Sequence, residues 1–377
     1  MAVSLQVKIA YSVEVDAPKA VAELAEQLGS IECDLLVFFC SVHYDLDLLA
    51  DELQKNFTCQ LIGCTTAGEI SSKNGFQKNG IVAAAIRSPK LQVHPYLIEN
   101  IATFDIDKAT ALSSTIRTDL QLQSLADQPM FGFMLIDGLS SAEEKTAALL
   151  YSTLNKMPLF GGSAGDDLAF EKTFVYFEGK FRQNCALLTL FETSLPFHIF
   201  KTQHLIPTDK KLVITGTIPG KRCITEINGY PAALEYARII DKQLIELNPA
   251  VFSKHPLLLK VGGEYYTRTI VNANADGSLS LYCDIDNGLV VSIAQSDNLV
   301  ENLKMTLSDV LTSVPNPRFI LGCDCIARKL ELEDKGLMDA NNDIFSNIPF
   351  LGFSTYGEQF NAIHINQTFT GVIIGDA

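Results

Sequence analysis

The chain has 377 residues, of which 47% are hydrophobic, and its formal net charge is −15. This length favours two domains, and the apolar content excludes extensive disorder. The negative charge disfavours nucleic acid and anionic membrane as partners, because both are bound largely through Lys and Arg.

The first predicted element is a buried strand at Leu35–Cys40, since strands buried on both faces are continuously hydrophobic. A second apolar run, Leu61–Ile62, leads into the turn Thr66–Glu69, whose order is hydroxyl residue, any residue, glycine, carboxylate. Another strand-like stretch follows the turn. We interpret the whole as strand, helix, strand, turn, strand, in which the helical crossover makes the first two strands parallel.

The same unit recurs further along the chain, at residues 130–166. A strand at Met130–Ile136 is followed by helical spacing over Glu143–Leu154, a short apolar run at Pro158–Phe160 and the turn Ser163–Asp166. Repetition of one supersecondary unit indicates that it is copied and reused.

The second turn also matches a catalytic pattern. Gly161–Gly165 reads G-x-S-x-G, the nucleophile elbow of α/β-hydrolases, which requires a helix directly after the serine. Here Thr173–Phe177 reads as a strand instead, and the serine position is threonine in the other copies. A hydroxyl that bonds its own turn backbone explains this better, so a serine hydrolase that uses Ser163 is the least favoured function.

A domain boundary is predicted near residue 225, giving domains at 1–225 and 226–377. Before it lie a strand at Leu212–Thr217 and a turn at Pro219–Lys221, and after it a helix at Ala232–Ile240. Four strands come next, at Leu257–Val261, Tyr265–Asn272, Leu279–Ile285 and Leu289–Ile293.

The third copy ends the chain. It follows a helix at Asp297–Leu311 and comprises Phe319–Cys323, Ile348–Leu351 and the turn Thr355–Glu358. The sequence therefore predicts an α/β fold, with two domains built from repeated strand-helix-strand-turn-strand units in mixed sheets.

The three turns are the predicted ligand-binding residues, because repeated turns could place their carboxylates and backbone amides around one cavity. The alternative is that each acid makes only a cap or turn bond. The predicted set is Thr66, Gly68, Glu69, Ser163, Gly165, Asp166, Thr355, Tyr356 and Glu358.

Cysteines and cofactor motifs suggest a reduced, cytoplasmic setting without a recognisable metal site. The nine cysteines are an odd number scattered through apolar runs, which is typical of reduced core cysteines. Cys323 and Cys325 lack the second pair that a zinc site needs, and neither a Walker loop nor a dinucleotide motif is present. No apolar run is long enough to span a bilayer, and the N-terminus lacks a signal-peptide pattern, so we expect a soluble protein.

Two histidines lie in apolar stretches, His94 within Leu91–Leu97 and His204 within Phe200–Ile206. Each is either an ordinary half-buried histidine or a proximal haem ligand, which needs one imidazole in an apolar pocket and no obligatory spacing motif.

Several separated segments together resemble the signature segments of FIST proteins, which are two-part sensory modules. The resemblance extends from about residue 30 to 365, so we expect no kinase or cyclase region in the given sequence. The segments are Cys40–Asp45, Gly63–Glu69, Phe160–Asp167 and Gly352–Glu358.

This resemblance implies a non-catalytic sensor that regulates a signalling enzyme in trans. In the similar nitric-oxide-sensing subgroup the cofactor is haem, and the partner is a histidine kinase of a two-component system or a cyclic-di-GMP enzyme, a diguanylate cyclase or phosphodiesterase. For that case we expect His94 as the iron ligand, with His204 as second choice. The alternative ligand is an amino acid or other small polar metabolite. Whether the protein forms a homodimer is left open by the sequence.

Overall fold

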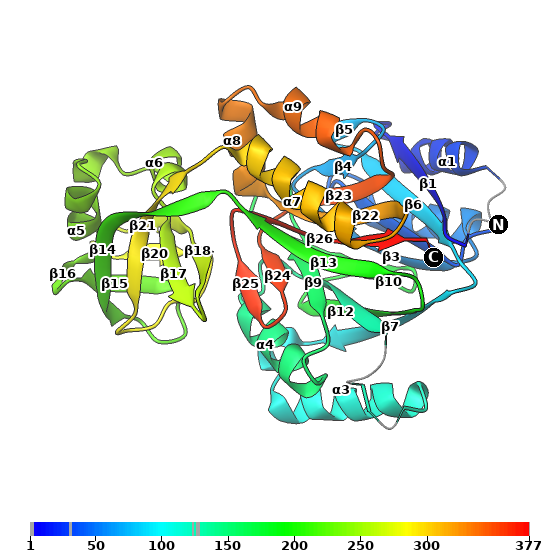
Figure 1. Cartoon of the computed structure of the whole chain (residues 1–377), viewed down its shortest axis with the longest axis horizontal. Helices are drawn as coiled ribbons and strands as arrows, with labels where there is room; N and C mark the ends of the chain where they lie inside the picture. The colour runs from blue at the N-terminus through cyan, green and yellow to red at the C-terminus, as the bar shows by residue number, and fades with distance from the viewer. Residues whose placement is uncertain (1–3, 30–31, 123, 126–128, 377) are drawn as a thin grey trace. The chain divides into compact units, whose positions relative to one another are not determined.

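A computed structural model describes residues 4–29, 32–122, 124–125 and 129–376 (Figure 1). Helices and strands alternate in mixed sheets, which confirms the predicted α/β class. The contact pattern divides the chain into two compact units. Unit 1 comprises 1–201, 304–364 and 369–377, and unit 2 comprises 202–303 and 365–368.

Unit 1 contains three six-stranded sheets of the same design. The first has the order β1 (Gln6–Ser12), β6 (Ile81–Arg87), β2 (Leu35–Cys40), β3 (Gln60–Thr65), β10 (Val175–Phe177), β11 (Lys180–Arg182). The second has the order β7 (Leu91–Glu99), β12 (Cys185–Thr193), β8 (Met130–Ile136), β9 (Leu159–Ser163), β24 (Glu358–Phe360), β25 (Ile363–Ile365). The third has the order β13 (Phe197–Gln203), β26 (Thr368–Gly375), β22 (Pro317–Cys325), β23 (Phe350–Thr355), β4 (Glu69–Ser71), β5 (Gly75–Gln77). In each sheet the two central strands are parallel, as the sequence predicts.

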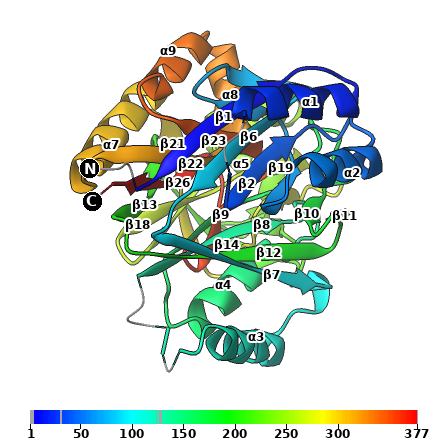
Figure 2. The same ribbon diagram turned by 90° about the vertical axis from the view of Figure 1, so that its right-hand side faces the viewer.

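Alternation along the strands explains why each sheet is apolar on both faces. On β2, Leu35, Val37 and Phe39 join a core shared by all three sheets, whereas Leu36 and Phe38 pack under helices. The helices of the three copies are α1 (Ala17–Leu28) and α2 (Leu46–Asn56), then α3 (Ile106–Asp119) and α4 (Glu143–Thr153), then α7 (Leu299–Ser313), α8 (Ile326–Asp334) and α9 (Met338–Asn342). Figure 2 shows α1 and α2 beside the first sheet, with α3 and α4 beside the second. Short 3-10 helices lie at Ile101–Thr103 and Asp343–Phe345.

The strands that follow the turns are exchanged cyclically among the sheets. The hairpin β4–β5 of the first copy pairs with β23 of the third, β10–β11 of the second pairs with β3 of the first, and β24–β25 of the third pairs with β9 of the second. Each turn therefore carries the chain from its own sheet into a neighbouring sheet, and all three turns lie where the sheets meet.

Unit 2 interrupts the third copy between β13 and α7 in the chain. Its strands are β14 (Leu205–Thr217), β15 (Cys223–Ile227), β16 (Tyr230–Pro231), β17 (Leu257–Val261), β18 (Glu264–Arg268), β19 (Ile270–Ala273), β20 (Leu279–Leu281) and β21 (Val290–Ser296). Helices α5 (Ala232–Ile239) and α6 (Pro249–Lys254) and a 3-10 helix at Leu244–Glu246 complete it. The predicted strand Tyr265–Asn272 is two strands, and only Leu279–Leu281 of Leu279–Ile285 is a strand. The predicted boundary near residue 225 lies inside this unit.

The prediction of reduced cysteines is wrong for one pair, Cys33 and Cys59, which form a disulfide. Cys33 precedes β2 and Cys59 precedes β3, and these neighbouring parallel strands begin side by side at Leu35 and Gln60. The other seven cysteines are buried and lie outside any disulfide, as predicted.

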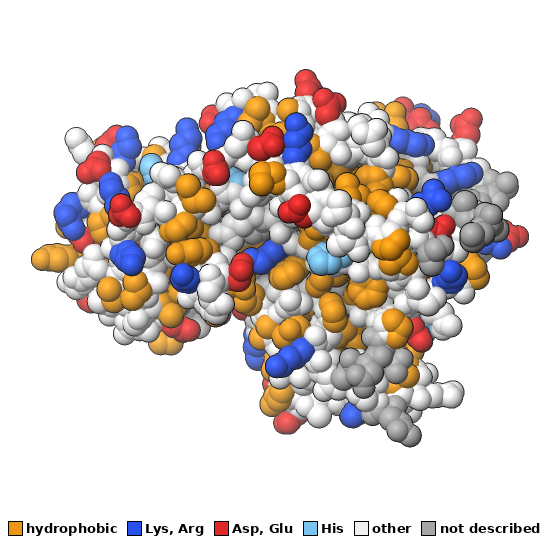
Figure 3. Space-filling view, viewed as in Figure 1, with side chains coloured by type: hydrophobic (Ala, Val, Ile, Leu, Met, Phe, Trp, Pro, Cys, Tyr) orange, Lys and Arg blue, Asp and Glu red, His pale blue; other side chains and the backbone are white. Residues whose placement is uncertain are grey.

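Two surface properties bear on partners. Over the described residues, no helix has the length and apolar character required to cross a bilayer. On the face shown in Figure 3, acidic and basic side chains are interspersed rather than gathered into one field of charge.

Candidate functional site

Unit 1 brings all three predicted turns together. We define the turn hub as residues Thr66–Glu69, Ser163–Asp166 and Thr355–Glu358. Each turn is bonded through the backbone to another turn or to the residue just before it: Ala67 N donates to Ser354 O (3.0 Å), Gly165 N to Thr65 O (2.9 Å) and Ser163 N to Gly357 O (2.9 Å). All nine predicted ligand-binding residues are buried in this hub.

The first and third turns have the same internal geometry. The hydroxyls of Thr66 and Thr355 each lie 2.7 Å from Oε1 of the glutamate three residues later. Each hydroxyl also accepts the backbone N–H of the intervening glycine, at 3.1 Å for Gly68 and 2.8 Å for Gly357. These glycines have φ of 137° and 152°, which side chains rarely adopt. The predicted bond between the hydroxyl and its own turn backbone is thus present in both.

The second turn differs because its carboxylate is used by the segment that follows. Asp166 accepts the backbone N–H groups of Phe170 (2.9 Å), Glu171 (2.6 Å) and Lys172 (2.9 Å). The Tyr356 hydroxyl donates to the same carboxylate. Asp166 therefore fixes the 167–173 loop, an insertion that separates this turn from its strand.

The 167–173 loop is held in an unusual backbone conformation. Asp167, Leu168 and Phe170 have φ of 53°, 70° and 54°, the left-handed region that non-glycine residues seldom occupy. The Tyr356 hydroxyl accepts the N–H of Leu168 at 2.7 Å, and its ring stacks on that of Phe170 at 4.7 Å. Side chains in this strained loop remain accessible, since Leu168 and Phe170 are 39% and 44% exposed.

Ser163 does not have the environment of a catalytic nucleophile. It ends β9, is fully buried, and its Oγ accepts a hydrogen bond from Gln359 Nε2 at 3.0 Å. Residues 164–174 contain no helix, so the strand-to-helix turn of a nucleophile elbow is missing there.

A buried lysine that the sequence analysis did not identify contacts the first turn. Lys329 on α8 is 2% exposed, and its Nζ donates to the carbonyl oxygen of Ala67 at 2.8 Å. Burial lowers the pKa of Lys329, because desolvation disfavours the charged ammonium. Burial likewise raises the pKa of Glu69 to about 8, although the bond from Thr66 opposes this.

The buried pair Asp324 and Arg328 was also missed. Arg328 Nε lies 2.6 Å from Asp324 Oδ1, and both side chains are at most 1% exposed. An acid at the end of an apolar strand with an arginine four residues on is the signal that could have revealed the pair, since buried charges need partners.

Polar groups from the first copy reach the 167–173 loop. Ser41 Oγ donates to Asp167 Oδ2 at 2.8 Å, and His43 Nε2 lies 4.0 Å from the same oxygen. The His43 side chain is 64% exposed and that of Asp167 is 16% exposed. These residues and the loop form the accessible edge of the hub.

The two predicted haem ligands lie elsewhere. His94 is on β7, which β8 and β12 separate from β9 and the hub, and its Nε2 lies 3.3 Å from Glu192 Oε2. His204 is 1% exposed and belongs to unit 2.

Comparisons with known proteins place the chain in one family. The FIST N domain matches residues 34–230, and the FIST C domain matches residues 232–361. An uncharacterized protein of Methanocaldococcus jannaschii is 23% identical over 352 residues, covering 83% of this chain and 67% of the relative.

Similarity to solved structures is weak. Cyanuric acid hydrolase from A. caulinodans aligns over 99% of this chain and 100% of its own, with 7% identity and a TM-score of 0.37. PurL of T. maritima, complexed with FGAR, aligns over 99% of this chain and 73% of its own, with 11% identity and a TM-score of 0.22.

Proposed function

Because the chain belongs to the FIST family, whose domains are generally small-ligand sensors in signalling, we propose that it is a non-catalytic sensor of a small polar metabolite. The ligand would bind at the accessible edge of the hub. The observation that supports this is the 167–173 loop, which holds three non-glycine residues in the left-handed region beside an exposed aromatic ring. Strained backbone of this kind clusters at ligand clamps and switches.

The edge of the hub offers complementary groups for such a ligand. The Asp167 carboxylate accepts hydrogen bonds, the exposed His43 ring can donate or accept, and the Phe170 ring offers apolar cover. A metabolite with an N–H or O–H donor, such as an amino acid, would compete with Ser41 for Asp167.

Signalling would follow from a change in the loop. In the first and third turns the Thr66 and Thr355 hydroxyls are bonded to Glu69 and Glu358, so these turns form a fixed base, whereas Asp166 and Tyr356 hold the loop by a few bonds. A ligand that favours a second loop arrangement shifts the population in proportion to its differential affinity. We propose that a histidine kinase or a cyclic-di-GMP enzyme reads this change in trans.

A thermal-shift screen of amino acids and related metabolites tests the proposal. We expect a ligand that raises the Tm of the wild type and loses its effect on Asp167→Asn. Glu171→Gln is the matched control, because Glu171 is exposed in the same loop and its backbone N–H makes the bond to Asp166. A screen without any stabilising ligand, or equal shifts in both variants, would contradict the proposal.

A second candidate function is haem-based sensing of nitric oxide, with His94 as the ligand. Metal-bound histidines usually give their other ring N–H to a carboxylate, and Glu192 is placed for this role. The iron would then be held by Nδ1, and when bound it would supply the nitric oxide site. His204 fits less well, because a porphyrin beside it would displace packed core.

An absorption spectrum of protein expressed with haem supply tests this second candidate. A Soret band that shifts with nitric oxide and is lost in His94→Ala supports it. A colourless protein, or a band unchanged in both His94→Ala and His204→Ala, counts against it.

A further inference from the structure

We propose that Cys33 and Cys59 form a redox switch, in which a dithiol opens the disulfide and the oxidised dithiol closes it while the chain stays folded. The disulfide joins the segments that lead into β2 and β3, and its Cα atoms lie 5.8 Å apart. Disulfides that solvent reaches are the labile and regulatory ones, because exchange begins when a thiolate attacks one of the two sulfur atoms.

Access separates this pair from the other cysteines. Cys33 and Cys59 are half-buried, whereas the seven cysteines outside the disulfide are buried. Burial also raises the pKa of four of those seven thiols, which are Cys40, Cys64, Cys185 and Cys323. A buried thiol of raised pKa holds little of the reactive thiolate. Among the nine cysteines, all of which lie in the described residues, we therefore expect exchange only at Cys33 and Cys59.

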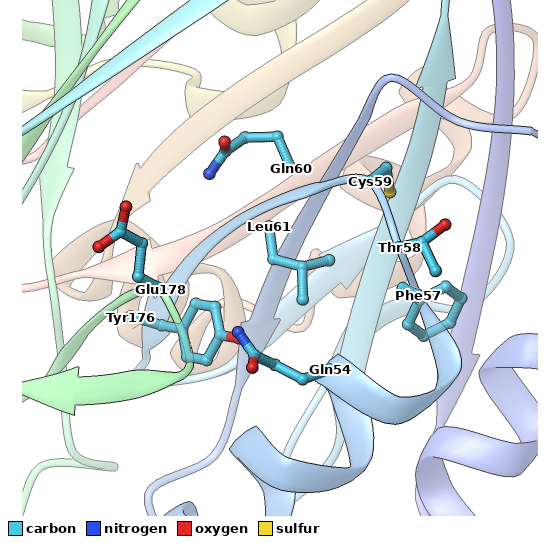
Figure 4. Close-up of a pocket in the computed structure, with 8 residues that line it drawn as sticks. All are labelled: Gln54, Phe57, Thr58, Cys59, Gln60, Leu61, Tyr176 and Glu178. Carbon is cyan, nitrogen blue, oxygen red and sulfur yellow. The ribbon is translucent and has the colours of Figure 1, made fainter.

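A surface depression gives access to Cys59. The depression has a volume of 490 Å³, and Cys59 lines it together with Thr58 and Gln60, its neighbours on the segment between α2 and β3 (Figure 4). Cys33 is not among the residues that line this depression. We therefore expect a thiolate to attack Cys59 Sγ, with Cys33 Sγ as the leaving group.

The pairing of β2 with β3 holds the two strands together without the disulfide. All six residues of β2 are paired with the six residues of β3. Gln60 N also donates to Asp34 O at 3.3 Å, and these two residues directly follow the cysteines. The hydrogen bonds remain when the disulfide opens, so we expect the fold to persist and the segments 32–34 and 57–59 to become more mobile.

The exchange balances within a dithiol couple. One thiolate of the dithiol attacks Cys59 Sγ, which forms a mixed disulfide and releases Cys33 Sγ as a thiolate that takes up a proton. The second thiol of the dithiol loses its proton and attacks its partner sulfur in the mixed disulfide, which releases Cys59 Sγ to be protonated in turn. The dithiol is thereby oxidised to a cyclic disulfide, and its two electrons reduce the cysteine pair. The reverse exchange restores the bond between Cys33 and Cys59.

Native alkylation of the full chain tests the switch. Dithiothreitol is the probe, because it is an uncharged dithiol and the carboxylate of Glu178 lines the depression beside Cys59. We expect N-ethylmaleimide to add two labels, mapped by mass spectrometry to Cys33 and Cys59, only after treatment with dithiothreitol. Oxidised dithiothreitol, added before the alkylation, should remove both labels. A chain that reacts only in denaturant, or that oxidised dithiothreitol does not close again, overturns the proposal.

Single variants check which cysteines take part. Cys33→Ser and Cys59→Ser should each take up one label without dithiothreitol, and the label at Cys59 should form faster because that thiol lines the depression. The matched control is Cys223→Ser, which changes a buried cysteine of unit 2 and should keep both labels dependent on dithiothreitol. Labelling of core cysteines in place of Cys33 and Cys59 would overturn the proposal.

Hydrogen exchange measures the structural consequence. Reduction should raise amide exchange in the segment 57–59 about tenfold, because the disulfide no longer holds this segment. A double variant that combines Cys33→Ser with Cys59→Ser should match the reduced wild type. The segment 155–157, which leads into β9 of the second copy without a disulfide, should be unchanged and is the internal control. Equal exchange in the oxidised and reduced proteins would show that the disulfide is not a switch.

Discussion

Lys329 donates from Nζ to the carbonyl oxygen of Ala67 at 2.8 Å, and so ties a helix of the third copy to the turn of the first. The two residues are separated by 262 positions in the sequence. The bond is buried, so its loss cannot be repaired by bulk water.

We therefore expect Lys329→Met to lower the free energy of unfolding by about 1–3 kcal/mol, the usual cost of an unpaired buried polar group. Lys335→Met is the control, because Lys335 directly follows this helix and makes a solvent-exposed pair with Glu331, worth less than about 1 kcal/mol. Denaturant unfolding measures both. Equal effects of the two variants would show that the bond to Ala67 is unimportant.

The raised pKa of Glu69 predicts a pH dependence of stability. Burial raises this pKa from the ordinary 4.5 to about 8, so between these values the folded state holds a proton that the unfolded state has lost. Glu69 therefore stabilises the fold at low pH, and its contribution is lost as pH rises towards 8, at most about 1.4 kcal/mol per pH unit.

Glu69→Gln should remove this fall in stability, since an amide does not titrate. Urea unfolding between pH 5 and pH 8, a range of roughly three units, compares the slopes of wild type and variant. The exposed Glu26→Gln should keep the wild-type slope. Parallel slopes in wild type and Glu69→Gln would mean that Glu69 is ionised throughout.

Because the first and third turns have the same hydrogen bonds, the same substitution in either turn should lower the free energy of unfolding by a similar amount. Thr66→Val and Thr355→Val each remove a hydroxyl that donates to a glutamate and accepts a glycine N–H, so each should cost about 1–3 kcal/mol. Ser163→Ala should cost less, because Gln359 Nε2 keeps its bond to Gly357. Thermal unfolding of the three variants tests the ranking, which fails if Ser163→Ala is the most destabilising.

Tyr356 should control the 167–173 loop. Tyr356→Phe keeps the stacking on Phe170 but removes the bonds to Asp166 and Leu168. We expect amide hydrogen exchange in the loop to rise about tenfold, which corresponds to about 1.4 kcal/mol. The exposed Tyr230→Phe should leave exchange in the loop unchanged. Wild-type exchange in Tyr356→Phe would show that Asp166 alone holds the loop.

The repeated unit and the parallel strand pairs could be predicted, because local hydrophobic runs and one glycine turn recur three times in the sequence. The exchange of hairpins could not be predicted, because β4 and β23 are far apart in the sequence and no local pattern indicates that they pair. Lys329 was missed because a lone lysine on a helix is usually exposed. The disulfide was missed because the nine scattered cysteines were interpreted as reduced core thiols, although the predicted pairing of β2 with β3 already places Cys33 near Cys59.

Hairpin exchange also sets an order of events during synthesis. Ser71 on β4 pairs with Leu351 on β23, which the ribosome makes 280 residues later, counting 351 minus 71. At about 5–20 residues per second, the first hairpin waits between about 14 and 56 s for its partner strand. Unpaired strand edges invite pairing with other chains. A nascent chain of this architecture is therefore a natural client for chaperones until its last copy has emerged.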